Sequence, residues 1–136
     1  SLTPVPAPNY NLSFEIDEES LVLISCSAHL WVHTTTTEFQ SAHGICYIEW
    51  YAQEDVSGSR LKLWQGKIAA GEWGQTGSLL AVESGATQSF TRSLLLSPGK
   101  YSIKAYFYAG KARDYFNEEI IGSIASRYIN IIVLKR

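Results

Sequence analysis

The sequence predicts an all-β protein: an antiparallel β-sandwich of jelly-roll type with about eight strands. Apolar and polar residues alternate with a period of two along most of the chain, and no segment shows a convincing helical period. Turn-forming residues recur at roughly ten-residue intervals, as they do in sandwiches and jelly rolls. A parallel α/β fold would need crossover helices, which this pattern does not supply.

Each expected strand has its own alternating pattern of side chains. In the long second strand, the even positions from Val22 to Val32 are apolar, whereas the odd positions from Ser25 onward suit a wetter face. Four glycines between residues 65 and 77 predict turns or bulges there, and residues 114–121 allow one helical turn inside a long loop. The expected strands are 12–16, 21–33, 44–52, 60–64, 78–83, 88–96, 100–109 and 125–134.

The stretch around Pro98-Gly99 predicts a hairpin that joins two core strands. Proline fixes φ at the first corner and glycine accepts a positive φ at the second, which is the pattern of a type II turn. The Gly99-Lys100 step also invites comparison with a phosphate-binding loop. That loop needs a glycine five residues earlier, where this chain has Leu94, and a helix after the lysine, where this chain has a strand pattern.

Composition excludes several classes of partner. The chain has 136 residues, enough for one domain, and a formal net charge of −2 at pH 7. No basic field is therefore available for a nucleic acid. The longest apolar runs, such as residues 21–24, span about four residues, whereas a membrane helix needs about 20. We expect a soluble protein with no nucleic-acid partner and no membrane insertion.

The chain divides into a Pro-rich lead or linker at 1–11 and a single sandwich domain at 12–136. Prolines at 4, 6 and 8 favour an extended polyproline spacer in a longer chain, and a disordered terminus explains them equally well. Cys26 and Cys46 both lie in apolar strand patterns. Two buried thiols are favoured over a disulfide, and no CxxC motif suggests zinc.

No residue pattern indicates catalysis, a metal or a cofactor, and we expect no enzyme. His29 and His33 lie about 13 Å apart on one strand, which is too far to share a zinc ion. Aromatic residues are the better candidates, because rings beside amides and carboxylates suit sugar or protein contacts. The alternative is that these rings cap the ends of the sandwich. The loop candidates for ligand binding are Trp73, Gln75, Arg113, Tyr115, Phe116 and Asn117.

The strand pattern resembles a family of compact jelly-roll domains in bacteriophage virions. The resemblance is carried by "LVLISCSAHLWV", "GICYIEWYAQ", "TQSFTRSLLLSPGKYSIKAYFYA" and "SRYINIIVLKR". The family includes tail-fibre tips, receptor-binding domains and head fibres, and its shape is related to the tumour-necrosis-factor-like fold. The resemblance implies a homotrimer whose distal loops recognise the host, and it implies no catalytic residue. The implied subunit contacts are Trp31, Tyr51, Tyr106 and Tyr108.

These observations support two main functional hypotheses. The first is a non-enzymatic structural or receptor-binding domain of a virion assembled in the host cytoplasm. Its partners would be other virion proteins and a host cell-surface glycan. The alternative is a carbohydrate-binding module of a secreted enzyme or adhesin, in which the two cysteines would pair. A small β-sandwich enzyme is a third possibility, and it lacks a supporting motif.

Overall fold

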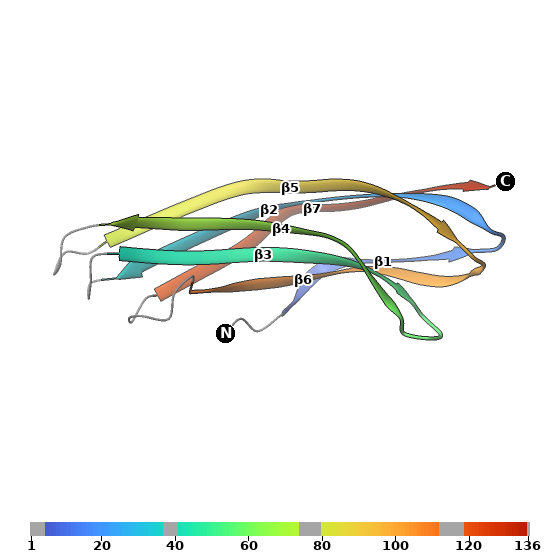
Figure 1. The fold of residues 1–136 in the computed structure, drawn as a ribbon, viewed down its shortest axis with the longest axis horizontal. Coiled ribbons are helices and arrows are strands. Elements are labelled where there is room, and N and C mark those ends of the chain that lie inside the picture. The colour runs from blue at the N-terminus through green and yellow to red at the C-terminus, as the bar shows by residue number, and fades with distance from the viewer. Residues whose placement is uncertain (1–4, 37–40, 74–79, 112–118, 136) are drawn as a thin grey trace.

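The fold is a sandwich of two antiparallel sheets, as the sequence predicts (Figure 1). The computed structural model describes residues 5–36, 41–73, 80–111 and 119–135, with side chains described at 11–34, 45–69, 83–110, 122–125 and 128–135. One sheet has the order β1-β6-β3-β4 and the other β5-β2-β7. The strands are β1 (Val5–Ile16), β2 (Ser20–Thr36), β3 (Ser41–Glu54), β4 (Arg60–Trp73), β5 (Leu80–Leu96), β6 (Gly99–Lys111) and β7 (Glu119–Lys135).

The described residues form seven strands because two of the expected eight are continuous. Residues 78–83 and 88–96 were expected as separate strands, but β5 runs through Gly85 and pairs with β2 along its whole length. Similarly, β4 runs from Arg60 to Trp73 through a region expected to hold turns or bulges, so that expectation is wrong up to residue 73. The expected helical turn is wrong for residues 119–121, which belong to β7, and its remaining residues lie outside the described ranges.

The Pro98-Gly99 corner does not form the expected hairpin. Strands β5 and β6 belong to different sheets, so the chain crosses the sandwich at this corner (Figure 1). The type II turn is also wrong, because Gly58 is the one glycine with a positive φ among those described. The Tyr101 hydroxyl donates a hydrogen bond to the Ser97 carbonyl oxygen at 2.6 Å and ties the corner together.

The Pro-rich lead enters the sheet earlier than its composition suggests. Strand β1 begins at Val5, and Val5 and Pro6 lie opposite Phe107 and Tyr106 of β6. The register shifts between Pro6 and Asn11 before regular pairing resumes. Strand β1 is an edge strand, which is where a strand tolerates proline because the missing N–H group need not join a ladder.

The core lies between the two sheets, and the even positions of β2 supply one wall. The Trp50 side chain of β3 is fully buried, with ring centroids 5.1 Å from Phe90 and 5.6 Å from Trp64. Strand β2 therefore presents its predicted face to this core. Its buried apolar residues are Val22, Ile24, Cys26, Ala28, Leu30 and Val32.

One edge of the sandwich is closed by an arginine and a close approach of two strands. The register of β3 and β4 shifts between Trp50 and Tyr51. Beside this irregularity, Arg92 Nη1 of β5 donates to the carbonyl oxygens of Lys62 and Leu63, at 2.8 and 3.2 Å. Gly66 lets the strands approach, since a Cβ there would lie 2.6 Å from Gln88 Oε1. Pairing with β3 continues through Gly66 and Gly71, so β4 is not interrupted at these glycines.

Both cysteines are buried free thiols, which confirms the favoured prediction. Burial raises the pKa of Cys26 and of Cys46 to about 12. The Cys46 thiol also donates to the Trp31 carbonyl oxygen at 3.6 Å. Because the thiolate is the nucleophile, neither side chain is poised to react near neutral pH.

We expect neither thiol to react with an aromatic disulfide reagent in the native protein at pH 8. Two thiols per chain should react once denaturant is added, since unfolding exposes both and restores an ordinary pKa. Absorbance of the released thiolate measures both stages. A Cys26→Ser variant provides the control, because it should release one equivalent after unfolding. Rapid reaction of the native chain would contradict this burial.

Candidate functional site

A group of tyrosines and charged residues covers part of the outer face of the four-stranded sheet. The odd positions of β3 and the even positions of β6 point outward, because their neighbours in sequence face the core. Pairing of these two strands places Tyr47 opposite Tyr108 and Glu49 opposite Tyr106. We call this group the tyrosine surface. It comprises Tyr47, Glu49, Tyr51, Arg60, Lys62, Lys67, Lys104, Tyr106 and Tyr108.

The four tyrosine rings are held in place by one another and by an arginine. Tyr47 and Tyr108 stack with centroids 4.4 Å apart and planes at 12°. Tyr51 and Tyr106 meet edge to face at 5.8 Å. The Arg60 guanidinium carbon lies 5.0 Å from the Tyr106 centroid and 5.9 Å from that of Tyr51, within the range of cation–π attraction. The rings are thus ordered before any partner binds.

A buried carboxylate lies among these rings. Glu49 is only 8% exposed although it is on the outer face of the sheet. Its Oε2 lies 2.8 Å from Lys62 Nζ and accepts a short hydrogen bond from the Tyr51 hydroxyl. Burial raises the pKa of the Glu49 carboxyl, but the hydrogen bonds from Lys62 and Tyr51 and the charge of Lys62 outweigh this effect and hold the pKa below its ordinary value. The hydrogen bond to Glu49 raises the pKa of Tyr51 to about 12.

The tyrosine surface is positively charged, although the whole chain is negative. Lys67 lies opposite Tyr47, and Lys104 lies opposite Tyr51. With Arg60 and Lys62 these residues give four cations, against the single carboxylate of Glu49. Glu49 pairs with Lys62 and accepts a hydrogen bond from Tyr51, so its role is to hold the side chains of this surface in place. The arrangement is therefore suited to binding through charge and ring contacts.

The structure divides the four predicted subunit-contact residues between two faces. Tyr51, Tyr106 and Tyr108 come together in the tyrosine surface, whereas Trp31 lies on β2, on the outer face of the other sheet. The Trp31 ring stacks on His33 at 5.6 Å, and its Nε1 donates to Glu83 at 3.2 Å.

The predicted loop site is outside the part of the chain that can be described. Trp73 ends β4, but its side chain is not among the described ones. The ligand-binding role of these residues therefore stays a prediction. The others outside the described residues are Gln75, Arg113, Tyr115, Phe116 and Asn117.

Sequence reasoning missed the charged members of the tyrosine surface. Glu49, Arg60 and Lys62 carry no motif, and each looks like an ordinary solvated residue of a strand. Alternation places Glu49 between Tyr47 and Tyr51, and this was the one available signal. Burial of Glu49 depends on the pairing of β3 with β4 and β6, which alternation does not reveal.

A second exposed group lies on the outer face of the three-stranded sheet, near the C-terminal end of β7. Leu21 of β2 lies opposite Leu95 of β5 and Leu134 of β7, and Leu23 lies opposite Ile132. Leu95 is 57% exposed, Ile132 and Leu134 are each 47% exposed, and Leu21 is 40% exposed. We call these five residues the apolar surface. Farther along β2 the outer face becomes polar at Ser25, as the sequence predicts.

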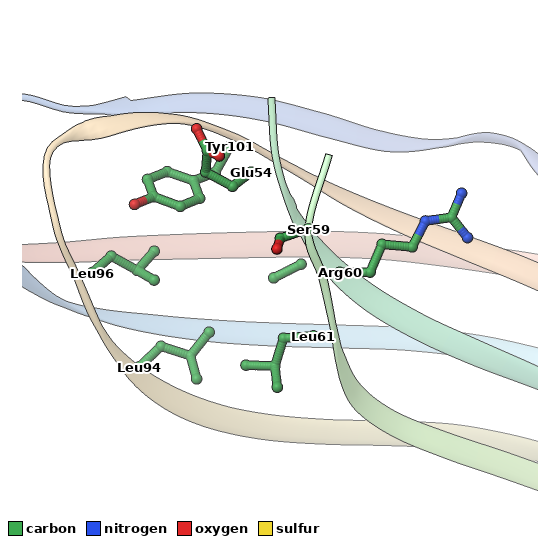
Figure 2. A pocket seen from close by; sticks show the side chains of 8 residues that line it. Glu54, Ser59, Arg60, Leu61, Leu94, Leu96 and Tyr101 are labelled. Carbon is green, nitrogen blue, oxygen red and sulfur yellow. The ribbon is translucent and has the colours of Figure 1, made fainter. Parts of the chain in front are cut away.

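A cavity of about 220 Å³ opens between the β3–β4 turn and the β5–β6 corner. Figure 2 shows Leu61, Leu94 and Leu96 on one side, the Tyr101 ring across from them, and Arg60 directed away. The Glu54 carboxylate at its rim already accepts hydrogen bonds from the backbone N–H groups of residues 56 and 57. The cavity is lined mainly by apolar surface.

Among the described residues, no three His, Cys, Asp or Glu side chains gather where they could hold a metal ion. His29 Nδ1 lies 3.3 Å from Thr87 Oγ1 on the outer face of the sheet. None of the described segments is a helix with the length and hydropathy needed to span a membrane.

The fold is a β-sandwich that carries the tyrosine surface on one sheet and the apolar surface on the other. No family model matches the chain, and no curated protein matches it. A chain in the structure of infectious bursal disease virus, Gx strain, is similar over 98% of this chain, with 12% identity and a TM-score of 0.30. The match covers 30% of the viral chain.

Proposed function

We propose that this chain is a non-enzymatic structural or receptor-binding domain of a bacteriophage virion and that it works as a homotrimer. The virion assignment rests on the strand pattern that resembles phage jelly-roll domains. The observation that carries the assembly is the apolar surface. Four exposed aliphatic side chains and the half-buried Leu23 form a contiguous apolar area on three adjacent strands, and such areas on soluble proteins mark contact sites.

A second copy of the chain is the proposed occupant of the apolar surface. Each Å² of apolar area removed from water contributes about 25 cal/mol, so aliphatic side chains at this exposure favour association. Interfaces between identical subunits are also more apolar than interfaces with non-obligate partners. We therefore assign the subunit contact to the apolar surface and to Trp31 on the same sheet face. The tyrosine surface, which includes Tyr51, Tyr106 and Tyr108, is left to face other partners.

We expect sedimentation velocity to show a trimer at micromolar concentration. Leu95→Asp should weaken association at least about 30-fold, because a charge placed within an apolar contact costs about 2 kcal/mol or more. Ser89→Asp is the matched control, since Ser89 is exposed on the same strand but lies outside the apolar surface. A wild-type chain that stays monomeric, or equal effects of the two substitutions, would refute the proposed assembly.

A further inference from the structure

We propose that the tyrosine surface is a docking site for an acidic surface of a partner protein. This inference rests on the partner-binding half of the proposed function and is independent of the proposed trimer. Glu49 is paired with Lys62, so the positive charge of Arg60, Lys67 and Lys104 remains to be matched. Among the described side chains, no carboxylate forms a salt bridge with any of these three residues. We therefore assign to the partner protein the carboxylates that would pair with these three cations.

The rings favour a protein partner over a sugar. A sugar platform needs an open ring face, but Tyr47 and Tyr108 cover one face of each other, and Arg60 lies over Tyr51 and Tyr106. The four rings are half-buried, and the hydroxyl groups and ring edges that still face solvent are suited to contacts with a protein. Tyrosine and arginine are enriched at the energetic centres of protein interfaces for this combination of apolar body and polar tip.

The surface is also arranged to bind with little loss of side-chain freedom. Glu49 fixes Lys62 and Tyr51 by a salt bridge and a hydrogen bond, and the four tyrosine rings pack in two pairs. Ordering these side chains in advance removes a cost that association would otherwise meet. The excess positive charge adds attraction at a distance for an acidic surface, and salt weakens that attraction.

The test uses poly-L-glutamate as the acidic probe and calorimetric titration of the full chain at low salt. Binding is expected, and it should weaken progressively as salt is added. Lys104→Glu and Lys67→Glu should each lower the affinity about tenfold by reversing a charge beside the rings. Tyr106→Ser should lower it by a similar factor through loss of the ring that Arg60 covers.

Lys100→Glu is the matched control. Lys100 is an exposed lysine on the same strand, but it lies opposite Glu15 at the far end of the sheet. It should leave the affinity for poly-L-glutamate unchanged. Equal losses from Lys100→Glu and Lys104→Glu would show attraction to the overall charge alone and would overturn the docking site.

Two further comparisons distinguish the protein-docking site from the binding of other polyanions and from the proposed trimer. Tighter binding of polygalacturonate or of a single-stranded oligothymidylate than of poly-L-glutamate would overturn the assignment to a protein partner. Sedimentation of Lys104→Glu should match that of the wild type, and Leu95→Asp should keep its affinity for poly-L-glutamate. A monomeric chain that binds poly-L-glutamate through the tyrosine surface would refute the trimer and support the docking site.

Discussion

Replacing Trp50 by alanine is expected to lower the free energy of unfolding by about 3–5 kcal/mol, the range for loss of a large buried aromatic side chain. Trp50 is fully buried on β3, and its ring contacts Trp64 on the same sheet and Phe90 on the opposite sheet. The substitution therefore removes a contact between the two layers as well as apolar area. The neighbouring rings cannot refill this volume without moving one sheet toward the other.

Urea unfolding followed by circular dichroism measures the effect of Trp50→Ala, provided that the slope of the transition is unchanged. Val56→Ala is the control, because Val56 is 91% exposed and its truncation should change stability by less than about 0.5 kcal/mol. A loss below about 1 kcal/mol for Trp50→Ala would mean that the tryptophan does not join the layers as described.

Replacing Gly122 by alanine is expected to destabilise the fold by about 1–3 kcal/mol, although it adds only one carbon. A Cβ at this position of β7 would lie 2.6 Å from the Ala109 Cβ and 3.0 Å from Phe107 Cζ, both on β6 of the facing sheet. The Ala109 Cβ is fixed to its backbone and has no rotamer that moves it away. The added methyl group must therefore displace a strand.

The same urea measurement tests Gly122→Ala, with Gly99→Ala as the control. A Cβ at Gly99 would meet its nearest neighbour, the Tyr101 ring, at an ordinary 3.5 Å. Gly99→Ala should therefore cost much less than Gly122→Ala. Adding Ala109→Gly to the Gly122→Ala chain should restore part of the lost stability, because it removes the atom that clashes. A double substitution that only adds the two losses would argue against this contact.

The sequence predicted the faces of individual strands well, because alternation reports directly on burial. It identified the core side of β2, whose even positions from Val22 to Val32 are all buried. It could not show that Tyr47 meets Tyr108, because that contact depends on which distant strands pair and in what register. Nor could it show that Glu49 becomes buried beneath the rings around it.

The wrong predictions come from local signals that tertiary contacts override. Pro98 and Gly99 do mark a corner, but turn propensity does not say which sheet the next strand joins. The glycines in β4 predict turns or bulges, because glycine considered alone disfavours a strand. In the fold, Gly66 admits Gln88 from the opposing sheet, and the pairing with β3 outweighs the intrinsic cost.

The repeated passage of the chain between the two sheets affects how the domain unfolds. Among the described strands, β3 and β4 are the one consecutive pair that lies side by side, and every other connection passes from one sheet to the other. Neither sheet is made from one uninterrupted length of polypeptide. A half-unfolded state that keeps one layer intact would need segments from both ends of the chain to stay together without their linking strands. The sandwich is therefore expected to unfold in a single cooperative step.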